Sequence, residues 1–152
     1  MISIPRDEQI DVFMETARSH LNRWYIWGGD DPFGFDCSGL VVECLKAAGL
    51  IETDEDFTAD GLWHKYHHGR EVARKDVSEG CLALWFNNRG RATHVAICTS
   101  NHFCITADGG GSKTNTEADA RKHNAYIKFR PIDHRRSAPR FVDPFVSGRS
   151  KG

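Results

Sequence analysis

One stretch of fourteen residues, from Trp27 to Leu40, constrains this chain more than any other part of it. Glycine, aspartate and proline dominate its first half, and the stretch then runs directly into a cysteine. Apolar residues follow at the spacing of one helix face: Leu40, Val41, Cys44, Leu45 and Ala48. Gly49 stands where a C-terminal helix cap belongs. The pattern predicts a turn-rich loop that leads at once into a helix over residues 37–48.

Cys37 opens this predicted helix. Asp36 is a good N-cap, because its carboxylate can accept hydrogen bonds from the first unpaired backbone N–H groups. Cys37 then falls in the first turn, where those N–H groups and the helix dipole favour an anion. Such an environment lowers a thiol pKa and produces the nucleophilic thiolate. We therefore expect Cys37 to be a nucleophile. The alternative is a small buried residue that happens to begin a helix.

The two blocks Tyr25–Gly29 and Gly34–Leu40 resemble the nucleophile motif of the NlpC-type cell-wall cysteine peptidases, a papain-like group. That motif reads Tyr-x-Trp/Tyr-Gly-Gly, then a short turn, then Gly-x-Asp-Cys-Ser-Gly-Leu/Phe. Both blocks match at the expected distance, and the resemblance continues more weakly to about residue 108. It implies a papain-like fold, a cysteine nucleophile, a histidine base, a polar residue that orients the base, and a bacterial cell-wall peptide as substrate.

His94 is the candidate base. In the family the base opens a strand that follows a Gly-Asp-Leu-x-x-Phe strand. Here residues 80–86 precede residues 93–98 in the same order, although Cys81 replaces the usual acid. The resemblance gives His94 the role of taking the Cys37 proton and later donating it to the departing amine. Without the resemblance, His94 reads as an ordinary strand histidine.

Two residues compete to orient His94. The family register falls on Thr106, where relatives carry His, Asn, Gln or an acid. Asp108 lies two residues further, on the same face of an extended strand, and its charge suits an imidazolium better. A third alternative is that a backbone carbonyl or a water molecule orients the ring. The sequence leaves these alternatives open.

The resemblance also assigns roles around the nucleophile. It places Tyr25 at the oxyanion site, where the backbone N–H of Cys37 is a second donor. It places Trp27, Asp36 and Ser38 on the substrate, with the last two lining the position of the free amine end of the peptide. The alternatives are a plain core aromatic for Tyr25 and a simple helix cap for Asp36.

Metal and phosphate sites receive weak support. His64 and His68 have the i, i+4 spacing of a helical ligand pair, but the zinc-protease glutamate is missing and Gly69 ends the segment. The glycine-rich residues 108–113 lack the spacing of a phosphate loop, so we interpret them as a loop that borders the cleft. We expect neither a metal ion nor another cofactor.

Charge and cysteine content exclude other classes of protein. The formal net charge is −1, so no basic excess favours nucleic acid, and we interpret residues 134–136 (His-Arg-Arg) as solvated surface. The five cysteines are odd in number and include no Cys-x-x-Cys pair, which argues against a zinc ribbon or a disulfide framework. We expect reduced thiols, with a bridge between Cys98 and Cys104 left open.

The order of the predicted elements indicates an α+β fold, with N-terminal helices packed on an antiparallel sheet. Helices are expected over residues 7–20, 37–48, 58–68 and 116–123, and strands over 80–86, 93–98, 102–107 and 125–131. We expect one papain-like domain over residues 1–146 and a flexible tail over 147–152.

These observations predict a cysteine endopeptidase that hydrolyses peptidoglycan stem peptides between D-glutamate and a diamino acid. The alternatives are a catalytically silent module in a phage tail or other assembly, and an amidase or acyltransferase on another small amide. The first residues resemble no signal peptide and no segment suits a membrane span. We therefore expect a cytoplasmic, virion-associated or delivered protein, with a phage tail or secretion system as partner and neither nucleic acid nor membrane.

Overall fold

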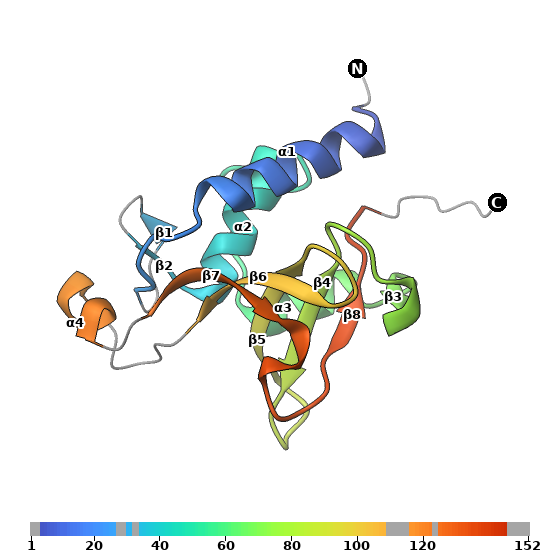
Figure 1. The fold of residues 1–152 in the computed structure, drawn as a ribbon. Helices are drawn as coiled ribbons and strands as arrows, with labels where there is room; N and C mark the ends of the chain where they lie inside the picture. Colours follow the sequence, from blue (N-terminus) through green and yellow to red (C-terminus); the bar gives the residue numbers. More distant parts are fainter. Residues whose placement is uncertain (1–3, 27–29, 32–33, 109–115, 123–124, 146–152) are drawn as a thin grey trace.

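The computed structural model describes residues 4–26, 30–31, 34–108, 116–122 and 125–145. In these residues an antiparallel sheet of six strands runs in the order β3-β8-β4-β5-β6-β7 (Figure 1). The strands are β3 (Glu71–Val72), β4 (Leu82–Phe86), β5 (Ala92–Cys98), β6 (Phe103–Asp108), β7 (Tyr126–Pro131) and β8 (Arg140–Val142). A separate short ladder pairs β1 (Asp30–Asp31) with β2 (Gly34–Phe35) just before the helix that begins at Cys37.

Two helices, α2 (Cys37–Ala47) and α3 (Ala59–Tyr66), pack on one face of the sheet. The other helices are α1 (Arg6–Ser19) and α4 (Glu117–Lys122), and short 3₁₀ turns occur at η1 (Arg74–Asp76) and η2 (Ile132–His134). α1 packs across α2, and both α2 and α3 pack on β5 (Figure 1). This arrangement confirms the predicted α+β class. No helix in the described ranges is long and apolar enough to cross a bilayer.

Both ends of α2 are fixed by the residues that the sequence singles out. The Asp36 carboxylate accepts a 2.6 Å hydrogen bond from the Gly39 N–H and so caps the first turn. At the other end Gly49 has a φ of +77°, which suits glycine. Its N–H donates to the Lys46 carbonyl, and the Leu50 N–H donates to that of Leu45. This Schellman arrangement ends the helix after Ala47.

Alternation along β4 and β5 divides the buried side chains between two faces. Leu82, Leu84, Val95 and Ile97 join the cluster beneath the helices. Trp85, Ala96 and Cys98 join a smaller cluster on the opposite face. Because successive side chains of a strand point to opposite faces, the side chain of His94 shares the face of Ala96, while Val95 faces the helices.

The predicted helices and strands match the observed ones within about two residues at their described ends. β3 and β8 were not predicted, although they complete one edge of the sheet. All five cysteines are free, including Cys98 and Cys104, which face each other across β5 and β6. The division into one domain over residues 1–146 stays a prediction, and the tail 147–152 lies outside the described residues.

Candidate active site

The Cys37 sulfur lies at the first turn of α2, against the edge of β5. The backbone N–H groups of Val95 and of Ser38 both point to this sulfur. β5 and β6 pair at Ile97–Ile105 and Cys98–Cys104, and the ladder of the described residues has no pair at Val95. Cys37 therefore lies where β5 and β6 separate, beside Val95, which directly follows His94 in the chain.

Burial raises the pKa of the Cys37 thiol to about 11. The N–H groups of Val95 and Ser38 and the Arg135 guanidinium lower this pKa, whereas the Asp36 carboxylate raises it. The prediction of a lowered thiol pKa is therefore wrong for this state. Loss of water around the sulfur outweighs the stabilisation that the helix start gives to a thiolate. Cys37 is a neutral thiol at neutral pH, and its activation needs a base.

His94 is buried in β5, and its ring lies against Trp85 with the ring centroids 5.4 Å apart. Its Nε2 atom lies 2.8 Å from the Oγ1 atom of Thr106, which is itself fully buried in β6. Burial, assisted by the Arg135 charge, lowers the pKa of His94 to about 3. The ring is therefore neutral at neutral pH. In the tautomer with the proton on Nε2, Thr106 accepts it and Nδ1 keeps a basic lone pair.

Asp108 lies two residues beyond Thr106 on the same face of β6. Its carboxylate oxygens lie 3.4 Å from Arg130 Nη1, 3.5 Å from His134 Nε2 and 3.8 Å from Arg135 Nη1. Its charge also raises the pKa of His94, in opposition to burial. The structure thus gives Thr106 the hydrogen bond to His94 and places Asp108 in an ionic cluster beside it. The orienting role of each stays a prediction.

His134 is the residue that sequence reasoning missed. The interpretation of residues 134–136 as solvated surface is wrong for its side chain, which is only 4% exposed. Its ring centroid lies 6.5 Å from that of His94 and 5.6 Å from that of Trp85. The two histidines and Asp108 offer ligand atoms within 4.8 Å of one another, and so form a group that could hold a metal ion. Because two arginines follow His134, the local sequence is typical of exposed surface and gives no sign that the His134 side chain is buried.

The other predicted site residues lie as follows. Tyr25 is buried in the core beneath the helices, and its N–H donates to the Ala125 carbonyl. Ser38 Oγ lies 3.5 Å from the capping carboxylate of Asp36. Trp27 lies outside the described residues, as does most of the glycine-rich loop after Asp108. The substrate and oxyanion roles of these residues stay predictions.

His64 and His68, the pair with helical ligand spacing, do not form part of this cluster. His64 is exposed on α3 and lies 3.2 Å from Asp60, its neighbour one turn earlier. His68 lies beyond the end of α3, where its ring contacts that of His67 at 3.8 Å between centroids. Each of the two histidines is therefore engaged with a different neighbour.

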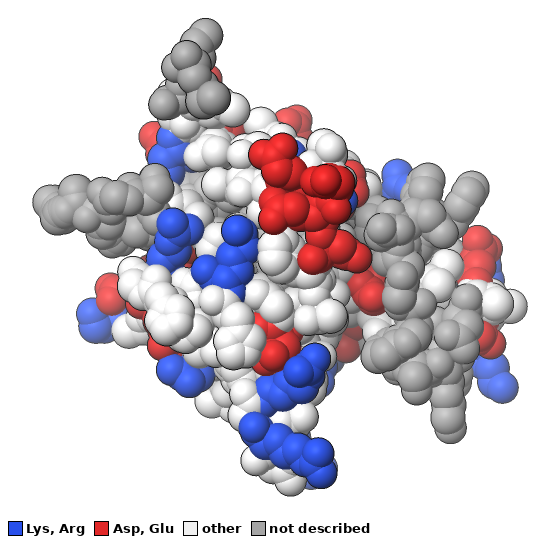
Figure 2. Space-filling model, turned by 180° about the vertical axis from the view of Figure 1, so that it is seen from behind, with Lys and Arg blue, Asp and Glu red and all other residues white. Residues whose placement is uncertain are grey.

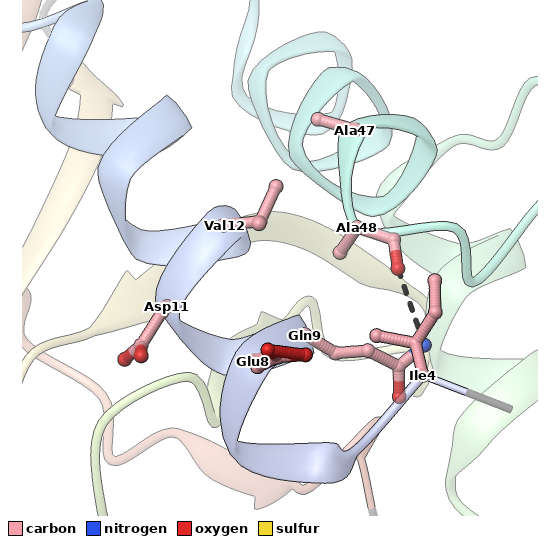
Figure 3. Close-up of a pocket in the computed structure, with 7 residues that line it drawn as sticks. All are labelled: Ile4, Glu8, Gln9, Asp11, Val12, Ala47 and Ala48. Atoms are coloured by element: carbon pink, nitrogen blue, oxygen red, sulfur yellow. Dashed lines mark hydrogen bonds between the residues drawn. The ribbon is translucent and has the colours of Figure 1, made fainter.

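Two surface features lie outside this site. A hollow of about 320 Å³ separates α1 from the C-terminal end of α2, where Gln9 donates to the Ala48 carbonyl (Figure 3). Cys37 occupies the opposite end of α2, so the hollow is not part of the candidate site around Cys37. On the face opposite to that of Figure 1, acidic side chains gather in one patch and basic ones lie apart from it (Figure 2).

Comparison with known proteins finds one matching family and several similar proteins. The sequence profile described as the NlpC/P60 family matches residues 22–134. The murein DD-endopeptidase MepH of Escherichia coli is 32% identical over 93 residues, which cover 59% of this chain and 33% of that protein. The gamma-D-glutamyl-L-lysine dipeptidyl-peptidase of Bacillus cereus is 29% identical over 90 residues, covering 57% of this chain and 25% of that one.

The peptidoglycan hydrolase RipB of Mycobacterium tuberculosis has a similar fold, with a TM-score of 0.65 and 22% identity. The likeness covers 93% of this chain and 68% of RipB. The chain spans about a third of the length of three curated relatives, MepH among them. Cys37, His94, Thr106, Asp108 and His134 all lie within the residues that the family profile matches.

Proposed function

The chain belongs to the NlpC/P60 family, and from that premise we propose that it is a cysteine endopeptidase acting on the stem peptides of peptidoglycan. The observation that carries the proposal is the position of Cys37. Its sulfur lies at the start of α2 against the N–H of Val95, which follows His94 in β5, and the His94 ring is held by Thr106. The names of the relatives, a murein endopeptidase and a glutamyl-lysine peptidase, supply the class of substrate.

The proposed reaction begins with proton transfer. His94 takes the proton of the Cys37 thiol, and the thiolate attacks the carbonyl carbon of the scissile amide. The backbone N–H of Cys37 and the Tyr25 side chain stabilise the oxyanion. The imidazolium then donates its proton to the departing amine, which leaves a thioester on Cys37. His94 next removes a proton from water, and the resulting hydrolysis restores the thiol and releases the carboxylate.

Two charges assist this proton transfer. Arg135 lowers the pKa of the Cys37 thiol, and Asp108 raises that of the His94 imidazole. Both effects favour the thiolate–imidazolium pair over the neutral pair that burial imposes. The charged cluster beyond Thr106 thus opposes the effect of burial at the two reacting groups. It provides a physical reason for an ionic network so close to a buried base.

We propose the bond between D-glutamate and the diamino acid as the one that is cut. The relatives include a murein DD-endopeptidase and a gamma-D-glutamyl peptidase. The substrate used in the assay must therefore contain both kinds of bond, so that either cut can be detected. A cross-linked muropeptide dimer meets this requirement. Mass analysis of the products after incubation identifies the bond, because each cut gives fragments of different mass.

The matched control for this assay is a second cysteine of the same helix. Cys37→Ala should abolish cleavage, whereas Cys44→Ala, which shortens a buried residue further along α2, should retain it. Equal product from wild type and Cys37→Ala, or no product from wild type, would favour the silent module. Products joined to an added amine instead of water would favour the acyltransferase. The predicted delivery partner, a phage tail or secretion system, stays a prediction.

A further inference from the structure

His134 directs an unsatisfied nitrogen into the cluster behind His94. Its Nδ1 lies 2.8 Å from the Pro131 carbonyl, to which it donates its proton. Nε2 then carries a lone pair, lies 3.5 Å from Asp108 Oδ2, and has no hydrogen-bond partner in the described part of the chain. A buried nitrogen without a partner costs free energy, and a bound ion or water molecule would remove that cost.

The distance between two of the three candidate ligand atoms suits a small metal ion. Zinc lies about 2.0–2.2 Å from nitrogen and oxygen ligands, so two ligands at a tetrahedral angle are roughly 3.4 Å apart. His134 Nε2 and Asp108 Oδ2 are 3.5 Å apart, and the third ligand atom, from His94, lies within 4.8 Å of both. Metal-bound histidines usually donate the other ring N–H to a carbonyl or carboxylate, as His134 does to Pro131.

We propose that His94, Asp108 and His134 form a binding site for a divalent transition metal ion of the zinc class. Three protein ligands leave a fourth position for water or for a group of the substrate.

The site has competitors for its ligands. Arg130 and Arg135 approach the Asp108 carboxylate, and Thr106 is bonded to the His94 ring. Both guanidinium groups are about one third exposed, so they can turn toward water when a cation arrives. Their charges still weaken cation binding. Removing one of these arginines should therefore tighten cation binding, whereas removing a ligand should weaken it.

Metal binding would switch off the base. A coordinated His94 has no lone pair left for the Cys37 proton, whichever ring nitrogen binds the ion. This consequence rests on the proposed function, whereas the binding itself does not. The ion would act as an inhibitor that coordinates His94 on the side of the sheet away from α2.

Binding is tested on the Cys37→Ala chain, in which the reactive thiol cannot hold the ion. Zinc affinity is measured by competition with a chromogenic chelator, and cobalt(II) absorption reports the ligands. We expect one ion per chain and a cobalt spectrum without a thiolate charge-transfer band. His134→Gln should weaken binding at least about tenfold. His102→Gln, which alters an exposed histidine, should leave it unchanged.

Arg130→Gln should tighten zinc binding and keeps the test decisive if the His134 variant does not fold. Binding that survives both His134→Gln and Asp108→Asn would overturn the proposal, as would no change with Arg130→Gln. Zinc binding by wild type that disappears in Cys37→Ala would instead assign the ion to the thiol. The proposed inhibition is tested separately by measuring cleavage with and without zinc. Zinc should inhibit the wild type, and it should inhibit His134→Gln less, when each rate is compared with the metal-free rate of the same protein.

Discussion

The Nε2 atom of His94 lies 2.8 Å from the Oγ1 atom of Thr106, and both side chains are buried. This contact links two neighbouring strands close to the point where the Cys37 sulfur meets β5. Thr106 carries no charge, so it can fix the tautomer and the orientation of the ring without stabilising an imidazolium by charge. Asp108 supplies that charge from one position further along the same face.

Thr106→Val keeps the shape of the side chain and removes its hydroxyl. We expect cleavage to fall roughly ten- to a hundredfold, because one unsatisfied buried polar group costs about 1–3 kcal/mol. Thr93→Val, which alters an exposed residue near the start of β5, is the matched control and should retain activity. Turnover on one muropeptide substrate measures both. A wild-type rate in Thr106→Val together with a severe loss in Asp108→Asn would transfer the orienting role to Asp108.

Alkylation by iodoacetamide reports the pKa of Cys37. Because burial raises this pKa to about 11, the thiolate fraction is small at pH 7 and grows about tenfold with each pH unit up to that value. The unfolded chain, with an ordinary thiol pKa of about 8.5, should react faster at pH 7–8. The other four cysteines are buried and should label last. Mass analysis of labelled peptides gives each rate.

A substitution of Arg135 also tests whether Cys37 rests as a neutral thiol. Its guanidinium lowers the pKa of the thiol, so Arg135→Gln should raise that pKa and slow alkylation of Cys37 at pH 8. A labelling rate that is already constant below pH 8 in the wild type would show that a thiolate–imidazolium pair exists before substrate binds. That result would contradict the neutral resting state.

Gly80 should be the glycine most sensitive to substitution among those of positive φ. Its φ is +97°, and a Cβ there would lie 3.0 Å from Cε2 of the buried Phe145. Gly90, with a φ of +77° and open space around it, is the control for backbone strain alone. Gly90→Ala should cost about 1 kcal/mol, and Gly80→Ala about 1–3 kcal/mol more. Urea unfolding of both variants gives the difference, and equal losses would contradict the clash.

The elements around the nucleophile could be predicted because their signals are local. Asp36 and Gly49 adjoin the helix that they cap, and the alternating residues of β4 and β5 lie within each strand. β8 has only three residues, and its pairing with β4 joins segments more than fifty residues apart. No local pattern identifies such a strand, because its stability comes from the neighbouring strands on both sides.

The chemistry of the site depended on tertiary contacts in the same way. Position at a helix start predicts a low thiol pKa, but β5 covers the Cys37 sulfur and burial reverses the direction. His134 stands beside two arginines in the sequence, yet the turn after β7 carries its ring beneath Trp85 and next to His94. The sequence identified Cys37 and His94 as candidates, and their catalytic roles stay predictions. The protonation of Cys37 and the place of His134 beside His94 and Asp108 required the fold.

Asp36 allows the two roles that its sequence position suggests to be separated. Asn is as good an N-cap as Asp, so Asp36→Asn should keep the hydrogen bond to Gly39 and nearly all the stability. Asp36→Ala should lose about 1 kcal/mol. Because the carboxylate raises the pKa of Cys37, Asp36→Asn should also speed alkylation of the thiol. Urea unfolding and iodoacetamide labelling measure these two effects.

Kinetics then decide whether Asp36 also binds the free amine of the substrate. If it does, Asp36→Asn should raise KM for a stem peptide with a free amine end and leave KM unchanged for the acetylated peptide, since only the first carries the complementary charge. If Asp36 is a cap alone, KM for the two peptides should shift equally or not at all. A loss of kcat for both peptides in a stable Asp36→Asn chain would contradict both roles and would place the carboxylate in the chemical step.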